Sequence, residues 1–167
     1  MSRGTVFVTD AQMRSSLAVI RSLGKQGLDV TAGEETRYAT GAFSRYCNRR
    51  LVYPSPKRKE EQFIEYLLET LRSTETDAIF PVADACLKPI IDHEEEISRY
   101  TQIALPPRDI FMKGYDKGVT LRIALDNGIP CPRTFFPENP DDAARIAGEI
   151  DYPVVVKPRV SSGRRGV

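Results

Sequence analysis

An α/β fold with a parallel sheet is what the sequence predicts, because short apolar segments alternate with helical ones. Residues 5–9 are β-branched and continuously apolar, which is typical of a strand buried on both faces of a sheet. Residues 13–26 then carry apolar side chains at helical spacing, and residues 28–32 form a second strand. A strand, a helix and a strand within about thirty residues make one right-handed crossover unit.

The same alternation continues along the N-terminal part of the chain. Residues 60–72 place an apolar stripe opposite a glutamate-rich face, which predicts a surface helix packed on the sheet. Residues 77–82 are the next buried strand, and residues 103–105 are a weaker one. Between them we expect one helix that carries Leu87, Ile90, Ile91 and Ile97. The segment 34–50 lacks periodicity and is expected to be a loop, with a short strand over 49–53 as the alternative.

Two adjacent prolines, Pro106 and Pro107, mark the boundary that we expect between two domains, residues 1–107 and 108–167. Prolines lack the backbone donor that helices and sheet ladders need, so they separate elements. The first domain is expected to be a Rossmann-like parallel sheet with helices on its faces. The second is expected to be smaller.

In the second domain, Asp116 is the predicted N-cap of a helix over residues 117–127. A strand is expected at 133–136. Asn139, followed by a proline and two aspartates, is a strong helix start, and that helix should end near Glu149. Residues 153–157 are then expected to be a buried strand, because three valines follow one another there.

Composition limits the function classes. The 167 residues include 24 lysines and arginines against 23 aspartates and glutamates, so net charge alone would recruit neither nucleic acid nor an anionic membrane. Cys47, Cys86 and Cys131 are far apart and, with only His93 beside them, argue for free thiols in a reducing compartment and against zinc. No apolar run is long enough for a secretion signal or a membrane span, so we expect a cytoplasmic protein.

Two lysines are candidates for anion binding. Lys157 directly continues the apolar run 153–156, which predicts a stem in the core and a partly desolvated ammonium at the strand end. The alternative is a lysine that extends into water at a sheet edge. Lys117 opens the predicted helix after Asp116, where the helix dipole disfavours a cation unless an anion lies beside it. Its alternative is a solvated surface lysine.

A donor-rich loop follows Lys157. Its residues Ser161, Ser162, Gly163, Arg164, Arg165 and Gly166 offer hydroxyls, close backbone approach and two guanidiniums suited to phosphate oxygens. Such a loop could bind a triphosphate, and the alternative is a flexible surface segment. The chain has neither a GxxxxGK[ST] loop nor a GxGxxG after the first strand, so a P-loop enzyme and a dinucleotide enzyme are not supported.

A second candidate region is the carboxyl edge of the predicted sheet, where open α/β sheets bind ligands. Asp10 and Arg14 follow the first strand, and Asp84 follows the strand at 77–82. These three residues are candidates for substrate binding. For Asp84 the alternative is that it caps the next helix.

Taken together, the motifs resemble the ATP-grasp superfamily in both order and spacing. The resemblance covers the whole chain, most clearly from about residue 104, and is closest to carboxylate-amine ligases like carbamoyl-phosphate synthase. It rests on Ala104-Leu105-Pro106-Pro107, Tyr115-Asp116-Lys117-Gly118, Asn127-Gly128-Ile129-Pro130-Cys131-Pro132-Arg133-Thr134, Tyr152-Pro153-Val154-Val155-Val156-Lys157-Pro158 and the Ser/Gly/Arg loop.

This resemblance implies residues 1–107 to be a pre-ATP-grasp domain and residues 108–167 the start of an ATP-grasp domain. It implies that Lys117 and Lys157 contact the phosphates of ATP and that the loop 161–166 folds over the triphosphate, although two arginines stand here in place of the usual small residues. The implied reaction activates a small-molecule carboxylate as an acyl phosphate, which an amine or ammonia then attacks, with Mg²⁺ neutralising the phosphates.

The family's metal ligands lie downstream of these motifs, so the sequence is expected to be an N-terminal fragment that is inactive alone. No catalytic residue and no metal ligand is assigned within it. A homo-oligomer is compatible with the family. The alternative function is a non-catalytic α/β module that binds a small ligand or regulates, using the sheet edge near Asp10 and Asp84.

Overall fold

The computed structural model describes residues 4–160 of the chain. It divides into two compact units, Met1–Arg108 and Asp109–Val167. The first unit contains a parallel sheet of five strands in the order β3-β2-β1-β4-β5, which confirms the predicted α/β class. The strands are β1 (Thr5–Val8), β2 (Asp29–Glu34), β3 (Arg49–Val52), β4 (Ala78–Phe80) and β5 (Gln102–Ile103).

The central position of β1 follows from its sequence. β1 pairs with β2 on one side and β4 on the other, so that Val6 lies opposite both Val30 and Ala78. A strand with neighbours on both edges and helices on both faces is buried all round, which is why its residues are continuously apolar. β3, at the sheet's edge, is the short strand that the alternative reading of residues 49–53 anticipated.

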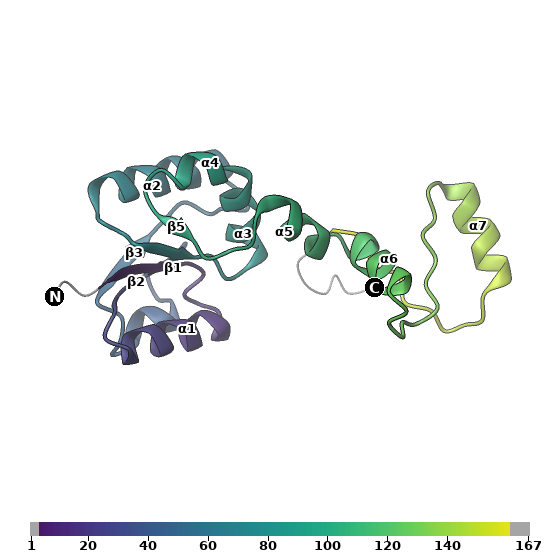
Figure 1. Cartoon of the computed structure of the whole chain (residues 1–167), viewed down its shortest axis with the longest axis horizontal. Helices are drawn as coiled ribbons and strands as arrows, with labels where there is room; N and C mark the ends of the chain where they lie inside the picture. The colour runs from purple at the N-terminus through teal and green to yellow at the C-terminus, as the bar shows by residue number, and fades with distance from the viewer. Residues whose placement is uncertain (1–3, 161–167) are drawn as a thin grey trace. The chain divides into compact units, whose positions relative to one another are not determined.

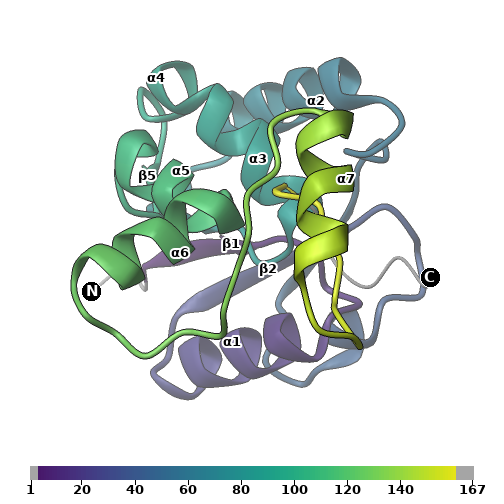
Figure 2. The same cartoon turned by 90° about the vertical axis from the view of Figure 1, so that its right-hand side faces the viewer.

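Helices cover both faces of this sheet (Figures 1 and 2). One face is covered by α1 (Arg14–Lys25) and the short 3₁₀ helix η1 (Thr40–Phe43), and the other by α2 (Glu60–Ser73), α3 (Asp84–Asp92) and α4 (Glu94–Ile97). Alternate residues of β1 point into the two layers. The layer with α1 buries Val6, Val8, Ile20, Val30 and Ala32, and the layer with α2 and α3 buries Phe7, Phe63, Leu67, Ile79 and Ile90.

The helix expected after β4 is interrupted, and this part of the prediction was wrong. His93, with φ −108° and ψ 23°, leaves helical geometry and separates α3 from α4. The three glutamates at 94–96 follow at once, and acidic residues favour a new helix N-terminus because they oppose the positive end of its dipole.

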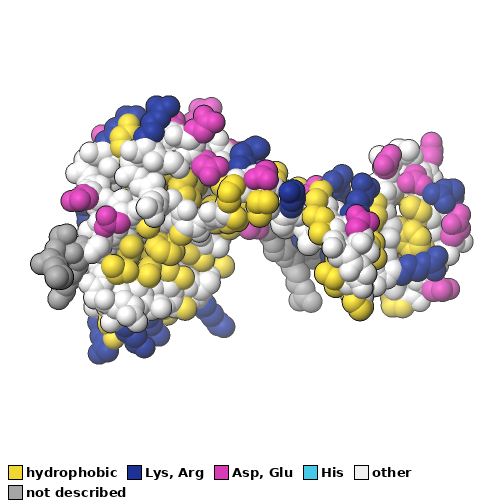
Figure 3. Space-filling model, viewed as in Figure 1, with side chains coloured by type: hydrophobic (Ala, Val, Ile, Leu, Met, Phe, Trp, Pro, Cys, Tyr) yellow, Lys and Arg dark blue, Asp and Glu magenta, His cyan; other side chains and the backbone are white. Residues whose placement is uncertain are grey.

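The second unit contains α5 (Arg108–Tyr115, which begins one residue before the boundary), α6 (Lys117–Asp126) and α7 (Pro140–Glu149). The helices α6 and α7 and their predicted caps, Asp116 and Asn139, are confirmed, whereas α5 was not predicted. Among the described residues of this unit, no hydrophobic side chain is buried. Figure 3 shows hydrophobic side chains reaching its surface.

The strands predicted at 133–136 and 153–157 were wrong, because neither segment forms a strand. A strand exists only where a neighbouring strand accepts its backbone hydrogen bonds, and within the described part of the second unit there is none. The valines of the second segment are consequently exposed rather than buried, Val155 to 79% and Val156 to 82%.

Candidate functional site

Asp10, at the carboxyl end of β1, is buried and uses its side chain within the protein. One carboxylate oxygen accepts hydrogen bonds from the backbone amides of Val82 (3.3 Å) and Ala83 (2.9 Å) and from the Thr9 hydroxyl (2.5 Å). The Asp10 amide in turn donates to the Tyr53 hydroxyl at 2.9 Å. Asp10 therefore joins the end of β1 to the loop that follows β4.

This network extends to Cys86 through Tyr53. The Tyr53 hydroxyl lies 3.4 Å from the Cys86 sulfur, and both side chains are buried. Burial is the main cause that raises the pKa of the Tyr53 phenol and the pKa of the Cys86 thiol, and the nearby Asp10 raises both further. Both groups are therefore neutral hydrogen-bonding groups at physiological pH.

Arg14 and Asp84 do not join Asp10. Arg14 is exposed at the first residue of α1, and Asp84 is half-buried at the first residue of α3. Within residues 4–160, neither side chain has a hydrogen bond or an ion pair with Asp10. The alternative role for Asp84 as the cap of α3 was wrong, because the N-cap residue is Ala83 and its position has no side-chain capping hydrogen bond.

A second tie at this sheet edge was not predicted from the sequence. Glu34, at the end of β2, accepts hydrogen bonds from the Gln12 amide at 2.9 Å and the Glu35 amide at 2.9 Å. The Gln12 side chain in turn accepts from the Thr40 amide at 3.1 Å. Polar groups at this edge thus fix loops to strand ends.

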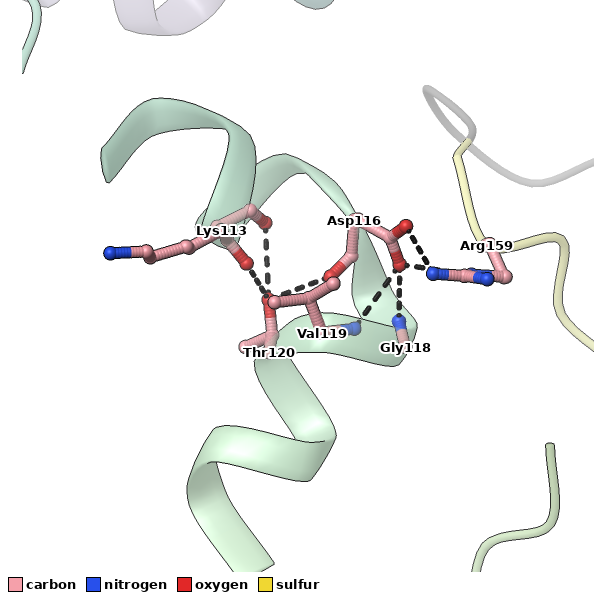
Figure 4. A network of polar contacts seen from close by, with 7 residues as sticks. Lys113, Asp116, Gly118, Val119, Thr120 and Arg159 are labelled. Carbon is pink, nitrogen blue, oxygen red and sulfur yellow. Dashed lines mark hydrogen bonds and ion pairs between the residues drawn. The ribbon is translucent and has the colours of Figure 1, made fainter. Parts of the chain in front are cut away.

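The second unit contains the other candidate region, at the N-terminus of α6. Asp116 caps the helix, because one of its oxygens accepts from the amides of Gly118 at 2.8 Å and Val119 at 3.2 Å. The hydroxyl of Thr120 lies 2.8 Å from the carbonyl oxygen of Lys113 and connects α6 to the end of α5. Figure 4 shows this network.

Arg159, which sequence reasoning missed, completes the network. Its guanidinium forms two contacts with Asp116, from Nε to Oδ1 at 3.2 Å and from Nη2 to Oδ2 at 2.7 Å (Figure 4). Its carbonyl oxygen accepts from the Lys117 amide at 2.9 Å. We call these three contacts the Asp116–Arg159 bridge. The only sequence signal was an arginine two positions after Lys157.

Electrostatics keep the bridge charged. The hydrogen bond from Arg159 is the main cause that lowers the pKa of Asp116, and the amides of Val119 and Gly118 lower it further. The anionic position at the N-terminus of α6 is therefore filled by the chain's own carboxylate.

The bridge joins the segments that carry the two candidate lysines. Lys117 is half-buried next to Asp116, and Lys157 is exposed two residues before Arg159. The prediction that the stem of Lys157 lies in the core was wrong, since Lys157 is exposed and no strand or core forms around it among the described residues. The loop residues Ser161, Ser162, Gly163, Arg164, Arg165 and Gly166 lie outside the described residues.

Residues 4–160 offer neither a cluster of metal ligands nor a membrane-spanning helix. In this range no group of three or more His, Cys, Asp or Glu side chains is placed to hold a metal ion. None of the described helices is long and apolar enough to cross a membrane. The three cysteines are not paired with one another.

Comparison with solved structures identifies the fold. An L-amino acid ligase from Bacillus licheniformis superposes with a TM-score of 0.68 and 16% identity, over 97% of this chain and 39% of its own. The biotin carboxylase domain of the Hydrogenobacter thermophilus 2-oxoglutarate carboxylase, solved with MgADP, gives 0.68 and 17%, over 98% of this chain and 36% of its own. The chain therefore shares the fold of the N-terminal part of these neighbours.

A third neighbour has the same fold. It is the N5-carboxyaminoimidazole ribonucleotide synthetase from Thermotoga maritima, which superposes with a TM-score of 0.61 and 16% identity. It covers 95% of this chain and 39% of its own. This chain thus spans under two fifths of the length of each neighbour. No family model and no curated protein sequence matches the chain.

Proposed function

We propose that this chain contributes the first part of an ATP-dependent ligase that joins a small-molecule carboxylate to an amine or ammonia. The shared fold supports this proposal, since one neighbour is an L-amino acid ligase and another was solved with MgADP and bicarbonate. In this proposal the unit Met1–Arg108 is the pre-ATP-grasp domain and Asp109–Val167 begins the nucleotide-binding domain.

The observation that carries the proposal is the Asp116–Arg159 bridge. Lys117 and Lys157 are 40 positions apart in sequence, as their numbers give, yet the bridge ties the backbone beside one to the backbone beside the other. Two ammonium groups on adjoining segments suit a ligand with several negative charges, such as the polyphosphate of ATP.

The chemistry that we propose is phosphoryl transfer followed by acyl transfer. A carboxylate oxygen of the substrate attacks the γ-phosphorus of ATP, the bond to the β,γ-bridging oxygen breaks, and ADP leaves. The amine nitrogen then attacks the acyl carbon and loses a proton to solvent as inorganic phosphate leaves. Lys117 and Lys157 stabilise the charge on the phosphates. Mg²⁺, when bound, would neutralise more of that charge.

The proposal also covers the cellular location, the substrates and the oligomeric state of the protein. We infer a cytoplasmic enzyme that acts on small molecules rather than on nucleic acid or membranes. The Hydrogenobacter carboxylase domain is a dimer, and a homo-oligomer is the corresponding prediction for this chain. The alternative, a ligand-binding module at the sheet edge, gains no support because Asp10 uses its carboxylate within the protein.

Calorimetric titration of the full 167-residue chain with MgATP tests the proposal. We expect Lys117→Ala and Lys157→Ala each to weaken binding by about tenfold, since each removes a charge-assisted contact with phosphate. The matched control is Lys113→Ala, because Lys113 is an exposed lysine of the same unit, 3.9 Å from Asp109 on α5. Equal MgATP affinity in the wild type and both lysine variants would refute the assigned phosphate site.

A further inference from the structure

The Asp116–Arg159 bridge fixes the orientation of the two segments that it joins more than it stabilises the folded protein. The Arg159 side chain is 65% exposed, and exposed ion pairs contribute little to folding because water and salt screen them. A two-contact guanidinium–carboxylate pair nevertheless fixes the relative orientation of the two groups that carry it.

What the bridge orients is the backbone on both sides. Asp116 is held to the first turn of α6 by two amides, so its carboxylate has a fixed position on the helix. The Arg159 guanidinium donates to that carboxylate. The Arg159 carbonyl oxygen accepts a hydrogen bond from the Lys117 amide. The segment after Lys157 is therefore tied to the helix end at two separate points.

Gly118 leaves room for this arrangement. A Cβ at residue 118 would lie 3.0 Å from Arg159 Nε and 3.1 Å from Asp116 Oδ1, closer than side chains ordinarily pack. The absence of a side chain there lets the guanidinium approach the capping carboxylate.

We propose that Arg159 is a positioning residue that acts through Asp116. It sets the distance between Lys117 and Lys157, so that both ammonium groups reach one polyphosphate without further rearrangement. The inference rests on the proposed function, and it assigns Arg159 a role in nucleotide binding without contact between Arg159 and the nucleotide.

The test is a double-mutant cycle on the full chain, with MgATP titrated into Arg159→Ala, Asp116→Asn and the double variant. Asp116→Asn keeps an oxygen that can cap α6 but removes the charge that pairs with Arg159. We expect each single variant to bind MgATP about tenfold more weakly, because either change removes the side-chain tie and leaves the segment that carries Lys157 held by the backbone bond from Lys117 to Arg159. The double variant should be no weaker than the weaker single variant, since both remove one interaction.

Two controls separate positioning from general damage. Arg145→Ala removes an arginine of similar exposure, 61%, that pairs with Asp142 and Glu149 on α7, and it should bind MgATP like the wild type. Adenosine, which has no phosphate, should compete with a fluorescent adenosine probe equally well in all variants. A loss of fold would weaken adenosine and MgATP together. Arg159→Lys should not restore MgATP binding, because an ammonium cannot make both contacts.

Three outcomes would overturn the inference. Unchanged MgATP affinity in Arg159→Ala, with a wild type that binds, would remove this role while leaving the proposed function intact. Weakened binding in Arg159→Ala with unchanged binding in Asp116→Asn would mean that Arg159 contacts the phosphates itself. Failure of the wild-type chain to bind MgATP at all would overturn both the inference and the proposed function.

Discussion

At the residue scale, Asp10 combines a strained backbone conformation with a buried carboxylate. Its φ of 55° lies in the left-handed region, which costs most residues about 1 kcal/mol or more and which aspartate and asparagine tolerate best. Its buried carboxylate accepts hydrogen bonds from the amides of Val82 and Ala83, and these bonds offset the strain. Asp10 thus lies at the sheet edge where open α/β sheets bind ligands, and its carboxylate makes structural hydrogen bonds there.

Replacing Asp10 by alanine should therefore destabilise the first unit. The change removes the acceptor of the Ala83 amide and one of the two acceptors of the Val82 amide, and it puts a less tolerant residue at a positive φ, so we expect a loss of about 2–4 kcal/mol. Asp10→Asn should lose about half as much, because its amide oxygen can still accept. Urea unfolding followed by circular dichroism measures both.

Asp29→Ala is the control for this experiment, since Asp29 is an exposed aspartate that begins β2 and its side chain has no partner among the described residues. Its unfolding free energy should stay within about 0.5 kcal/mol of the wild type. An Asp10→Ala protein as stable as the Asp29→Ala protein would contradict the structural role of Asp10.

The candidate site was only partly predictable at this scale. The Asp116 cap was predicted because capping depends on neighbours within three residues. Arg159 was missed because its partner lies 43 positions away, and nothing local indicates such a pair. Asp84 was a candidate cap by sequence, yet Asp10 takes the amides of that turn from a distant strand.

At the element scale, α1 packs closely against the segment after η1. A Cβ on Gly24 would lie 2.6 Å from the Tyr46 Cβ, a distance that packed side chains do not tolerate. Glycine near the end of this helix is therefore required by packing, although it costs helix propensity.

Two glycine-to-alanine changes test this reading in opposite directions. Alanine favours a helix over glycine by about 1 kcal/mol, but overpacking costs about 1–3 kcal/mol, so Gly24→Ala should lower the free energy of unfolding by about 1–2 kcal/mol. Gly148→Ala in α7 meets nothing within 4 Å and should stabilise its helix by about 0.5–1 kcal/mol.

Urea unfolding measures the first variant, and amide exchange of α7 measures the second. If Gly24→Ala raised the unfolding free energy as an unhindered helical glycine should, the close contact with Tyr46 would be absent from the folded protein.

Elements of the first unit could be predicted because periodicity reports burial locally. The stripe of α2 and the continuous apolar run of β1 follow directly from which faces meet the core. The apolar run at 153–157 also predicted a buried strand. It forms none, because the described part of its unit has no neighbouring strand to pair with it. A segment's own residues cannot reveal whether that partner exists.

At the scale of the whole molecule, the two units differ in how they are held together. Buried hydrophobic side chains of the described chain lie between Val6 and Ile97, all in the first unit. The second unit is held within its described residues by helix caps and exposed polar contacts such as the Asp116–Arg159 bridge. Because apolar burial is the main stabilising term in folding, we expect the second unit to open far more readily.

Native-state hydrogen exchange read by mass spectrometry tests this expectation. Amides of α6 and α7 should exchange through openings at least about 2 kcal/mol easier than those of β1 and β4, which should open only with the whole first unit. The α1 peptide serves as the internal reference for protection in the first unit. Equal protection in α1 and α7 would show that the second unit has a core of its own.

The three consecutive valines at 154–156 lie open to water, and this has a consequence for handling the protein in solution. β-branched residues without a partner readily form backbone ladders with other molecules, so the chain is prone to self-association at high concentration. Pro153 and Pro158 bracket the run and lack backbone donors, while Lys157 adds charge. These flanking residues act as gatekeepers that keep any such intermolecular ladder short.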